Sequence, residues 1–114
     1  DITKFLENSE LTQHVHIQQT AESAMSMLTE SIDAFVRKDL LLARKVMKED
    51  NTVDDLFNQI KTEVIQEIAR NPDEGELCVD MMMIAKYFER IADHVVNIAE
   101  WVEYSVTGEH KAHE

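Results

Sequence analysis

Five oxygen-bearing side chains stand four residues apart in two groups within this 114-residue chain. Asp50 and Asp54 form the first group, and Glu89, Asp93 and Asn97 form the second. In a helix, residues four apart lie one above the other on the same side. Stacked carboxylates repel each other, and a bound cation removes that repulsion. Ligation by oxygen alone favours hard ions such as magnesium, calcium, manganese or iron over a structural zinc site.

The segments around these residues have the apolar periodicity of helices. Apolar side chains recur at steps of three and four residues over 11–37, 40–70 and 76–105. Asp39 is a suitable N-cap for the second helix, and Pro72 with Gly75 separates the second helix from the third. Gly108 is expected to end the third helix. Three helices are therefore predicted.

Each helix has one apolar seam that we expect to be buried. The seam residues are Ile17, Ala21, Ala24, Leu28, Ile32 and Phe35 in the first helix, Ala43, Val46, Val53, Phe57, Ile60, Val64 and Ile68 in the second, and Met81, Ile84, Phe88, Ile91, Val95, Ile98 and Val102 in the third. Helices joined by short turns can bury such seams only against one another. The predicted fold is an all-α, antiparallel up-down-up three-helix bundle over residues 11–109. Residues 1–10 are expected to be a linker or the end of a preceding helix, and residues 110–114 a frayed tail.

The turn at Pro72 brings the two acidic groups to similar heights. Asp54 lies 18 residues before Pro72 and Glu89 lies 17 after it, while Asp50 lies 22 before and Asp93 lies 21 after. At ~1.5 Å per residue, the matched carboxylates are level, roughly 25–33 Å from the turn. At ~100° per residue they lie at the edge or on the flank of the apolar arcs. This placement predicts an open groove or strip instead of a closed internal cage.

Charge and cysteine content restrict the partners. The formal net charge of −12 argues against nucleic acid and against anionic membrane surfaces, and it suits cations or a basic patch on a protein. No apolar run approaches the ~20 residues of a membrane span, so no integral membrane segment is expected. Cys78 is the single cysteine, which excludes an internal disulfide and is typical of a reducing compartment. Because the chain begins with Asp1 instead of Met, we expect a piece of a longer protein.

Two segments resemble the PhoU family of phosphate-uptake regulators. Residues 87–109, YFERIADHVVNIAEWVEYSVTGE, are similar to that family's C-terminal signature. Residues 33–60, DAFVRKDLLLARKVMKEDNTVDDLFNQI, are similar to the preceding element, in which an Asp opens a helix and an acid-x-x-x-Asp pair follows. The resemblance covers residues 20–109. It implies an all-helical protein of two tandem three-helix bundles, of which this chain resembles the second.

The resemblance also implies which residues bind metal. Asp50 and Asp54 match the first acidic motif, and Glu89 and Asp93 match the second. Asn97 follows one turn later as an accessory oxygen, with Glu100 a weaker candidate. The implied cofactor is a divalent or trivalent metal, whether iron, zinc, magnesium or manganese.

Location and partners follow from the same resemblance. Family members act in the bacterial cytoplasm as non-enzymatic regulators of phosphate uptake and phosphate-starvation signalling. They contact the ATPase of a phosphate ABC transporter and a sensor histidine kinase. An isolated repeat exposes surface that its missing companion would cover, so a homo-oligomer such as a homodimer is expected.

Two alternatives remain open on the residues alone. The first is a metal-independent helical protein-interaction module, in which the acids are solvated or paired with nearby cations such as Lys86, three residues before Glu89. The second is a metal-dependent hydrolase, which needs an acid or base near the metal. Only His94 is near the acidic group, and no nucleophile–base arrangement or phosphate-binding glycine loop is visible. We therefore predict that the chain is not an enzyme.

Overall fold

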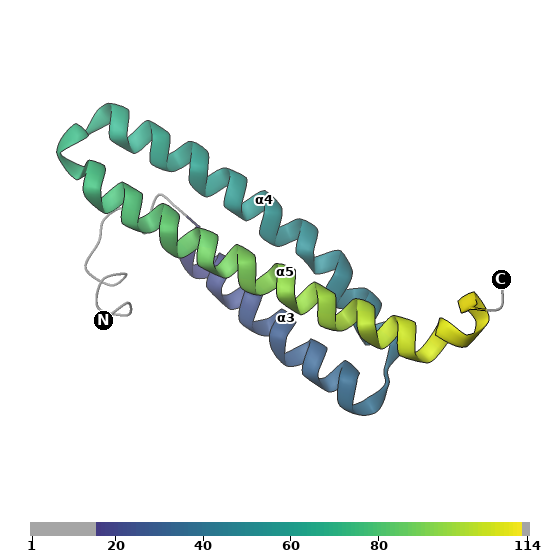
Figure 1. Cartoon of the computed structure of the whole chain (residues 1–114). Coiled ribbons are helices and arrows are strands. Elements are labelled where there is room, and N and C mark those ends of the chain that lie inside the picture. Colours follow the sequence, from purple (N-terminus) through teal and green to yellow (C-terminus); the bar gives the residue numbers. More distant parts are fainter. Residues whose placement is uncertain (1–15, 113–114) are drawn as a thin grey trace.

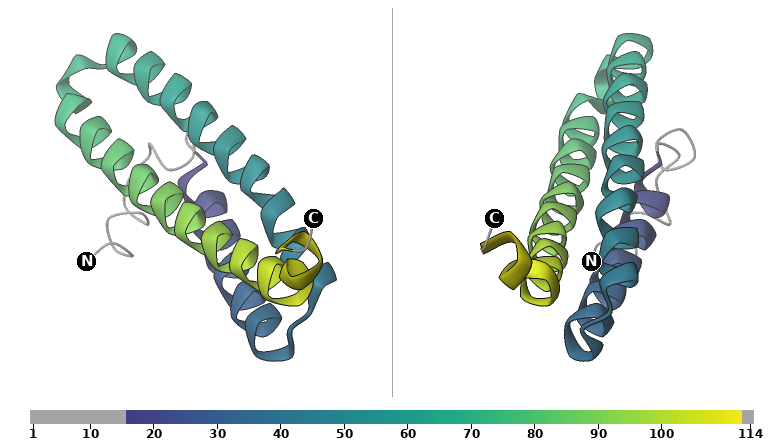
Figure 2. Two further views of the ribbon diagram at one scale, coloured as in Figure 1. Left: turned by 45° about the vertical axis from the view of Figure 1, so that its right-hand side comes forward. Right: turned by 90° about the vertical axis from the view of Figure 1, so that its right-hand side faces the viewer.

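The computed structural model describes residues 16–112, which form three long helices and one short 3-10 turn (Figure 1). The elements are α3 (Ile17–Arg37), α4 (Leu40–Arg70), η1 (Pro72–Glu74) and α5 (Gly75–Ala112). Within this range there is no strand. α4 and α5 run antiparallel as a long hairpin, and the shorter α3 packs against both (Figure 2). The predicted all-α, antiparallel up-down-up bundle is confirmed.

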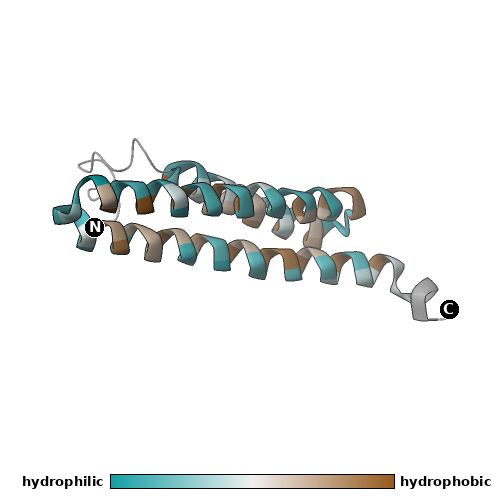
Figure 3. Ribbon diagram, turned by 90° about the horizontal axis from the view of Figure 1, so that it is seen from above, coloured by the Kyte–Doolittle hydropathy of each residue, from teal (hydrophilic) through white to brown (hydrophobic). Residues whose placement is uncertain are grey.

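The core consists of two clusters of buried side chains that follow one another along the bundle. Figure 3 shows how hydrophobic and hydrophilic residues alternate along the helices. The clusters contain Met27, Ala34, Ala43, Val46, Val53, Ala92, Val95, Ala99 and Val102, and then Ile17, Ile60, Val64, Cys78, Met81 and Ala85. Apolar residues thus lie on one face of each helix instead of surrounding it. Among residues 16–112, none of the helices has the length and apolarity needed to cross a membrane.

The buried face of α3 is offset from the predicted seam. Ile32 and Phe35 were expected in the core, but they are 51% and 53% exposed, whereas Ser31 and Ala34 are fully buried. The Ser31 hydroxyl donates to the carbonyl oxygen of Leu28 at 2.8 Å. A serine that satisfies its hydroxyl within its own helix can occupy a buried position without an unpaired donor. Apolar periodicity alone therefore misplaces this face.

Small side chains fill central positions of α5. Ala85, Ala92 and Ala99 are fully buried. The larger residues of the predicted α5 seam that stand beside them are only partly buried, namely Ile84, Phe88, Ile91 and Ile98. Alanine at a helix contact lets the two backbones approach closely, so larger neighbours lie at the margins. On α4, the predicted seam residues Phe57 and Ile68 are partly buried and 36% exposed, respectively.

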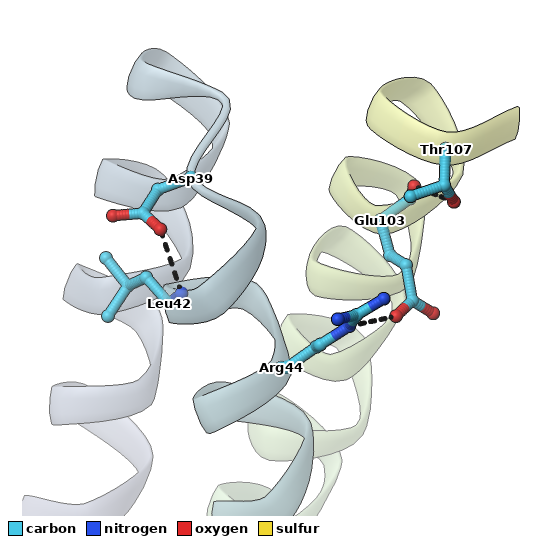
Figure 4. Close-up of polar contacts among 5 residues, drawn as sticks. All are labelled: Asp39, Leu42, Arg44, Glu103 and Thr107. Atoms are coloured by element: carbon cyan, nitrogen blue, oxygen red, sulfur yellow. Dashed lines mark hydrogen bonds and ion pairs between the residues drawn. The ribbon is translucent and has the colours of Figure 1, made fainter.

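Two polar contacts fix α4 at its N-terminal end (Figure 4). The Asp39 side chain accepts a hydrogen bond from the Leu42 backbone N–H at 3.1 Å, which confirms the predicted N-cap. Arg44 Nε donates to Glu103 Oε2 at 2.8 Å and so joins the start of α4 to the later part of α5. Lys38, the residue before Asp39, has the left-handed conformation, with φ 54° and ψ 45°. α4 itself has the predicted bounds.

One outer end of the bundle differs from the predictions. α3 begins at Ile17, with His16 at its N-cap position, and residues 11–15 of the predicted first helix lie outside the described range. α5 continues to Ala112, so the stop predicted at Gly108 is wrong. A glycine ends a helix when it adopts a left-handed conformation, and Gly108 has no positive φ. The expected linker at residues 1–10 and the last two tail residues lie outside the described range.

Candidate metal centre

The α4–α5 hairpin brings three of the predicted ligands together. Asp50 and Asp54 come from α4 and Asp93 comes from α5, and one carboxylate oxygen of each lies within 4.8 Å of the others. Two oxygens bound to one ion at ~2.0–2.5 Å lie at most about 5 Å apart. The three carboxylates are therefore close enough to share one cation. Their proximity agrees with the similar distances of Asp50 and Asp93 from Pro72 along the chain.

Asp50 has surroundings that are unfavourable for a charged carboxylate. It is partly buried, and its Oδ1 is shielded from solvent without a hydrogen-bond partner among the described residues. Burial is the main cause that raises the pKa of Asp50, followed by the negative charges of Asp54, Asp93, Glu89 and Glu100. Each of these causes disfavours a buried anion. A cation at this position would reverse that balance.

Asp54 has similar surroundings with one compensating charge. Burial raises its pKa most, and Glu89 and Asp93 raise it further, whereas the positive charge of Lys86 lowers it. Asp93, in contrast, is exposed. The group is therefore open to solvent on the α5 side, which matches the predicted strip and leaves room for water to complete the coordination of an ion.

The other two predicted ligands lie beside this three-carboxylate group. Glu89 stands one helical turn before Asp93, and its Oε1 accepts a hydrogen bond from Lys86 Nζ at 2.6 Å. The possible Lys86–Glu89 ion pair is thus present. Asn97 lies one turn after Asp93 at an exposed position. In this arrangement Lys86 competes with any metal for Glu89.

A second acidic cluster, between α3 and α4, was missed by the sequence prediction. Lys45 Nζ forms ion pairs with Glu30 and, at 3.3 Å, with Glu49. Burial raises the pKa of Glu49 most, Glu30 raises it further, and Lys45 lowers it. The Lys45–Glu49 spacing was visible in the sequence, but the approach of Glu30 depends on the rotation of α3. Because this cluster includes its own cation, it does not need a metal for charge balance.

Comparisons with known proteins show which family the chain belongs to. Residues 17–102 match the family described as the PhoU domain. Proteins from Borreliella burgdorferi, Caulobacter vibrioides and Aquifex aeolicus are 30%, 32% and 33% identical to this chain over 93, 93 and 84 residues. The matched segments cover 82%, 82% and 74% of this chain and 42%, 40% and 38% of those proteins.

The three relatives share one name, phosphate-specific transport system accessory protein PhoU homolog. The chain spans about two fifths of the length of these relatives. The family match extends over all of α3 and α4 and over α5 as far as Val102. The chain belongs to the PhoU family.

Proposed function

We propose that this chain is a metal-binding part of a non-enzymatic regulator of phosphate uptake and phosphate-starvation signalling, acting in the cytoplasm. Membership of the PhoU family and the names of its relatives as transport accessory proteins support the regulatory role. The single observation that supports metal binding is the convergence of Asp50, Asp54 and Asp93 from two helices. An accessory role also makes catalysis by this chain unnecessary.

The chain's own residues suggest how metal would act. Asp50, Asp54 and Asp93 would bind the ion, with Glu89 joining if Lys86 releases it and Asn97 adding an oxygen. A divalent or trivalent cation such as iron, zinc, magnesium or manganese supplies positive charge at this point and links α4 to α5. The hairpin becomes more rigid because its carboxylates no longer repel one another. A rigid hairpin would then present a constant surface to the transporter ATPase or the sensor kinase.

Metal analysis after equilibrium dialysis tests the metal site. The wild-type chain, dialysed against micromolar manganese, should retain about one ion per chain. The Asp50→Asn/Asp93→Asn double variant should retain none. A matched control, Asp33→Asn/Asp80→Asn, removes two exposed carboxylates elsewhere and should bind as the wild type does. Equal retention by both double variants would reject the site.

Partner binding is tested separately. The purified transporter ATPase and the cytoplasmic part of the sensor kinase are each passed over immobilised chain, with manganese or with a chelator. We expect binding that is stronger with manganese for the wild type and unchanged by manganese for the Asp50→Asn/Asp93→Asn variant. If neither protein binds under either condition, the proposed partners of this part of the molecule are wrong.

The alternative function is a metal-independent interaction module. The Lys86–Glu89 pair and the Lys45 contacts to Glu30 and Glu49 favour it, because lysines already compensate some of the acidic charge. This alternative predicts that the chain binds its partners equally well in chelator and in manganese. The same binding assay therefore separates the two functions.

A further inference from the structure

An apolar groove lies between α4 and α5 next to the acidic residues. It has a volume of about 340 Å³. Its lining consists of Lys86 and six apolar side chains, namely Phe57, Val64, Ile68, Val79, Met82 and Met83. Val79 and Met83 are 55% and 65% exposed. Apolar side chains that gather at a hollow and remain exposed are typical of a protein-binding site.

The groove opens away from the core. No α3 residue is among those that line it. Met81, which is fully buried, belongs to the same core cluster as Ile17 of α3. Met83 lies two residues later and so points ~200° around α5 from Met81. α3 therefore covers one side of the hairpin, and the groove is on a side that α3 does not cover.

Lys86 connects this groove to the acidic group. Its Nζ lies 5.2 Å from the centre of the Phe57 ring, which lines the groove, and 2.6 Å from Glu89 Oε1. Along α4, Asp54 stands one turn before Phe57, and Asp50 stands one turn before Asp54. The hairpin thus presents about three turns of apolar surface followed by about two turns of acidic surface, a span of roughly 27 Å.

We propose that this groove binds an amphipathic helix of a partner protein, with an apolar stripe seated in the groove and Lys or Arg side chains reaching Asp50, Asp54 and Asp93. Charge complementarity selects this occupant. Three carboxylates at the end of an apolar hollow attract a basic segment, and the net charge of −12 repels an anionic lipid surface. Helix-in-groove binding of this kind uses apolar anchors at i, i+3, i+4 and i+7. The proposal does not require metal.

The probe is a synthetic helical peptide of about 18 residues, long enough to span the apolar and acidic surfaces. It has leucines at i, i+3, i+4 and i+7 and three lysines at one end, and versions with the lysines at either end cover both directions. Binding to the intact chain is measured by fluorescence anisotropy at low salt in chelator. One lysine-ended version should bind at least about tenfold more tightly than a scrambled peptide or one with glutamates in place of lysines. Equal binding by the scrambled peptide would overturn the proposal.

Variants of the chain locate the peptide. Met83→Glu places a charge in the groove and should weaken binding at least about tenfold. The control Val36→Glu changes an apolar residue of α3 that is 73% exposed, and it should bind as the wild type does. Asp54→Asn/Asp93→Asn should weaken only the lysine-ended peptide. Thermal unfolding checks that each variant is folded, and equal affinities for Met83→Glu and Val36→Glu would contradict the assignment.

A second copy of the chain is the competing occupant. Sedimentation velocity of the chain without peptide shows whether two copies associate. If the wild type dimerises and Met83→Glu abolishes the dimer, the groove is a self-association surface and the partner-helix proposal is wrong. We expect Met83→Glu to leave the oligomeric state unchanged. Because all of these measurements are made in chelator, their failure would leave the metal site untouched. Loss of metal binding with these carboxylates intact would likewise leave the peptide measurements unchanged.

Discussion

At the scale of single residues, Asp50 is where folding creates an electrostatic cost. Its carboxylate is partly buried, one oxygen has no hydrogen-bond partner within the described range, and Asp54 and Asp93 lie close by. A protein without need of a cation would gain stability by replacing this side chain. Its presence is consistent with a ligand that offsets the cost.

Asp50→Asn should therefore stabilise the metal-free chain. In chelator at about pH 7, we expect the melting temperature to rise by roughly 2–4 °C, the effect of removing a local like-charge contact. The pKa of Asp50 is higher in the folded state than in the unfolded state. The folded state therefore binds more protons in the window between the two pKa values, so wild-type stability falls as pH rises through it.

The stability gap between Asp50→Asn and the wild type should accordingly be largest near neutral pH and should narrow towards about pH 4, close to the ordinary pKa of Asp. Thermal unfolding across this pH range measures it, with Asp33→Asn as an exposed control. If Asp50→Asn is less stable than the wild type in chelator, or if the difference in stability does not change with pH, the Asp50 carboxylate does not destabilise the folded state.

Part of the site could be predicted residue by residue. Spacing of four and similar distances from Pro72 are sequence properties, and they predict that Asp50 and Asp93 lie at similar heights on α4 and α5. The partner of Glu89 could not be predicted in this way. Lys86 lies three residues before Glu89, so either this lysine or a metal ion can neutralise the Glu89 carboxylate. The Glu30 contact with Lys45 could not be predicted, because the rotation of α3 depends on which face packs against two helices at once.

At the scale of the elements, the α3–α4 connection shows how a tight break forms without glycine or proline. Lys38 takes the left-handed conformation, and Asp39 then caps α4. Left-handed backbone is unfavourable for a residue with a side chain. The sequence marks this break only through the capping Asp, which explains why the helix boundary was predictable but the strained residue was not.

Lys38→Gly should stabilise the chain by about 1 kcal/mol because glycine has no steric penalty at positive φ. Chemical denaturation measures this free energy of unfolding. The matched control is Arg37→Gly, one residue earlier and inside α3, which should destabilise by about 1 kcal/mol through loss of helix propensity. If Lys38→Gly is as destabilising as Arg37→Gly, the left-handed assignment of Lys38 is incorrect.

Close helix packing should also control the acidic group. Ala92 is fully buried in the core and precedes Asp93 directly. Ala92→Leu should destabilise the chain by about 1–3 kcal/mol through overpacking. By forcing α5 outward, it should also weaken manganese binding. Chemical denaturation measures the loss of stability and calorimetric titration measures the manganese affinity. The control for both is Ala69→Leu, which enlarges an exposed alanine of α4. If Ala92→Leu lowers the stability but leaves the manganese affinity unchanged, packing at Ala92 does not control the metal site.

At the scale of the whole molecule, the hairpin of α4 and α5 has two different sides. One side packs against α3 and forms the core. Another holds the acidic group and the apolar groove, joined by Lys86. Apolar periodicity and turn residues predicted the bundle. They could not show that the groove adjoins the acidic group, because this depends on the direction in which side chains such as Met83 point relative to the buried face of α5.

The chain spans about two fifths of the length of the relatives it matches. The homo-oligomer expected from the sequence stays a prediction for this chain. A concentration series by sedimentation velocity decides it, and a monomer at all concentrations would reject it.

We propose that carboxylates from two antiparallel helices share one cation. Thermal unfolding during a manganese titration is the decisive measurement for this shared ion. A ligand that binds only the folded state stabilises by about 2.7 kcal/mol at one hundred times its dissociation constant. We predict that the wild-type melting temperature rises steadily from chelator to millimolar manganese, while that of Asp50→Asn/Asp93→Asn stays constant. A wild-type melting temperature that does not respond to manganese, or a double variant that responds equally, would show that these carboxylates do not share a cation.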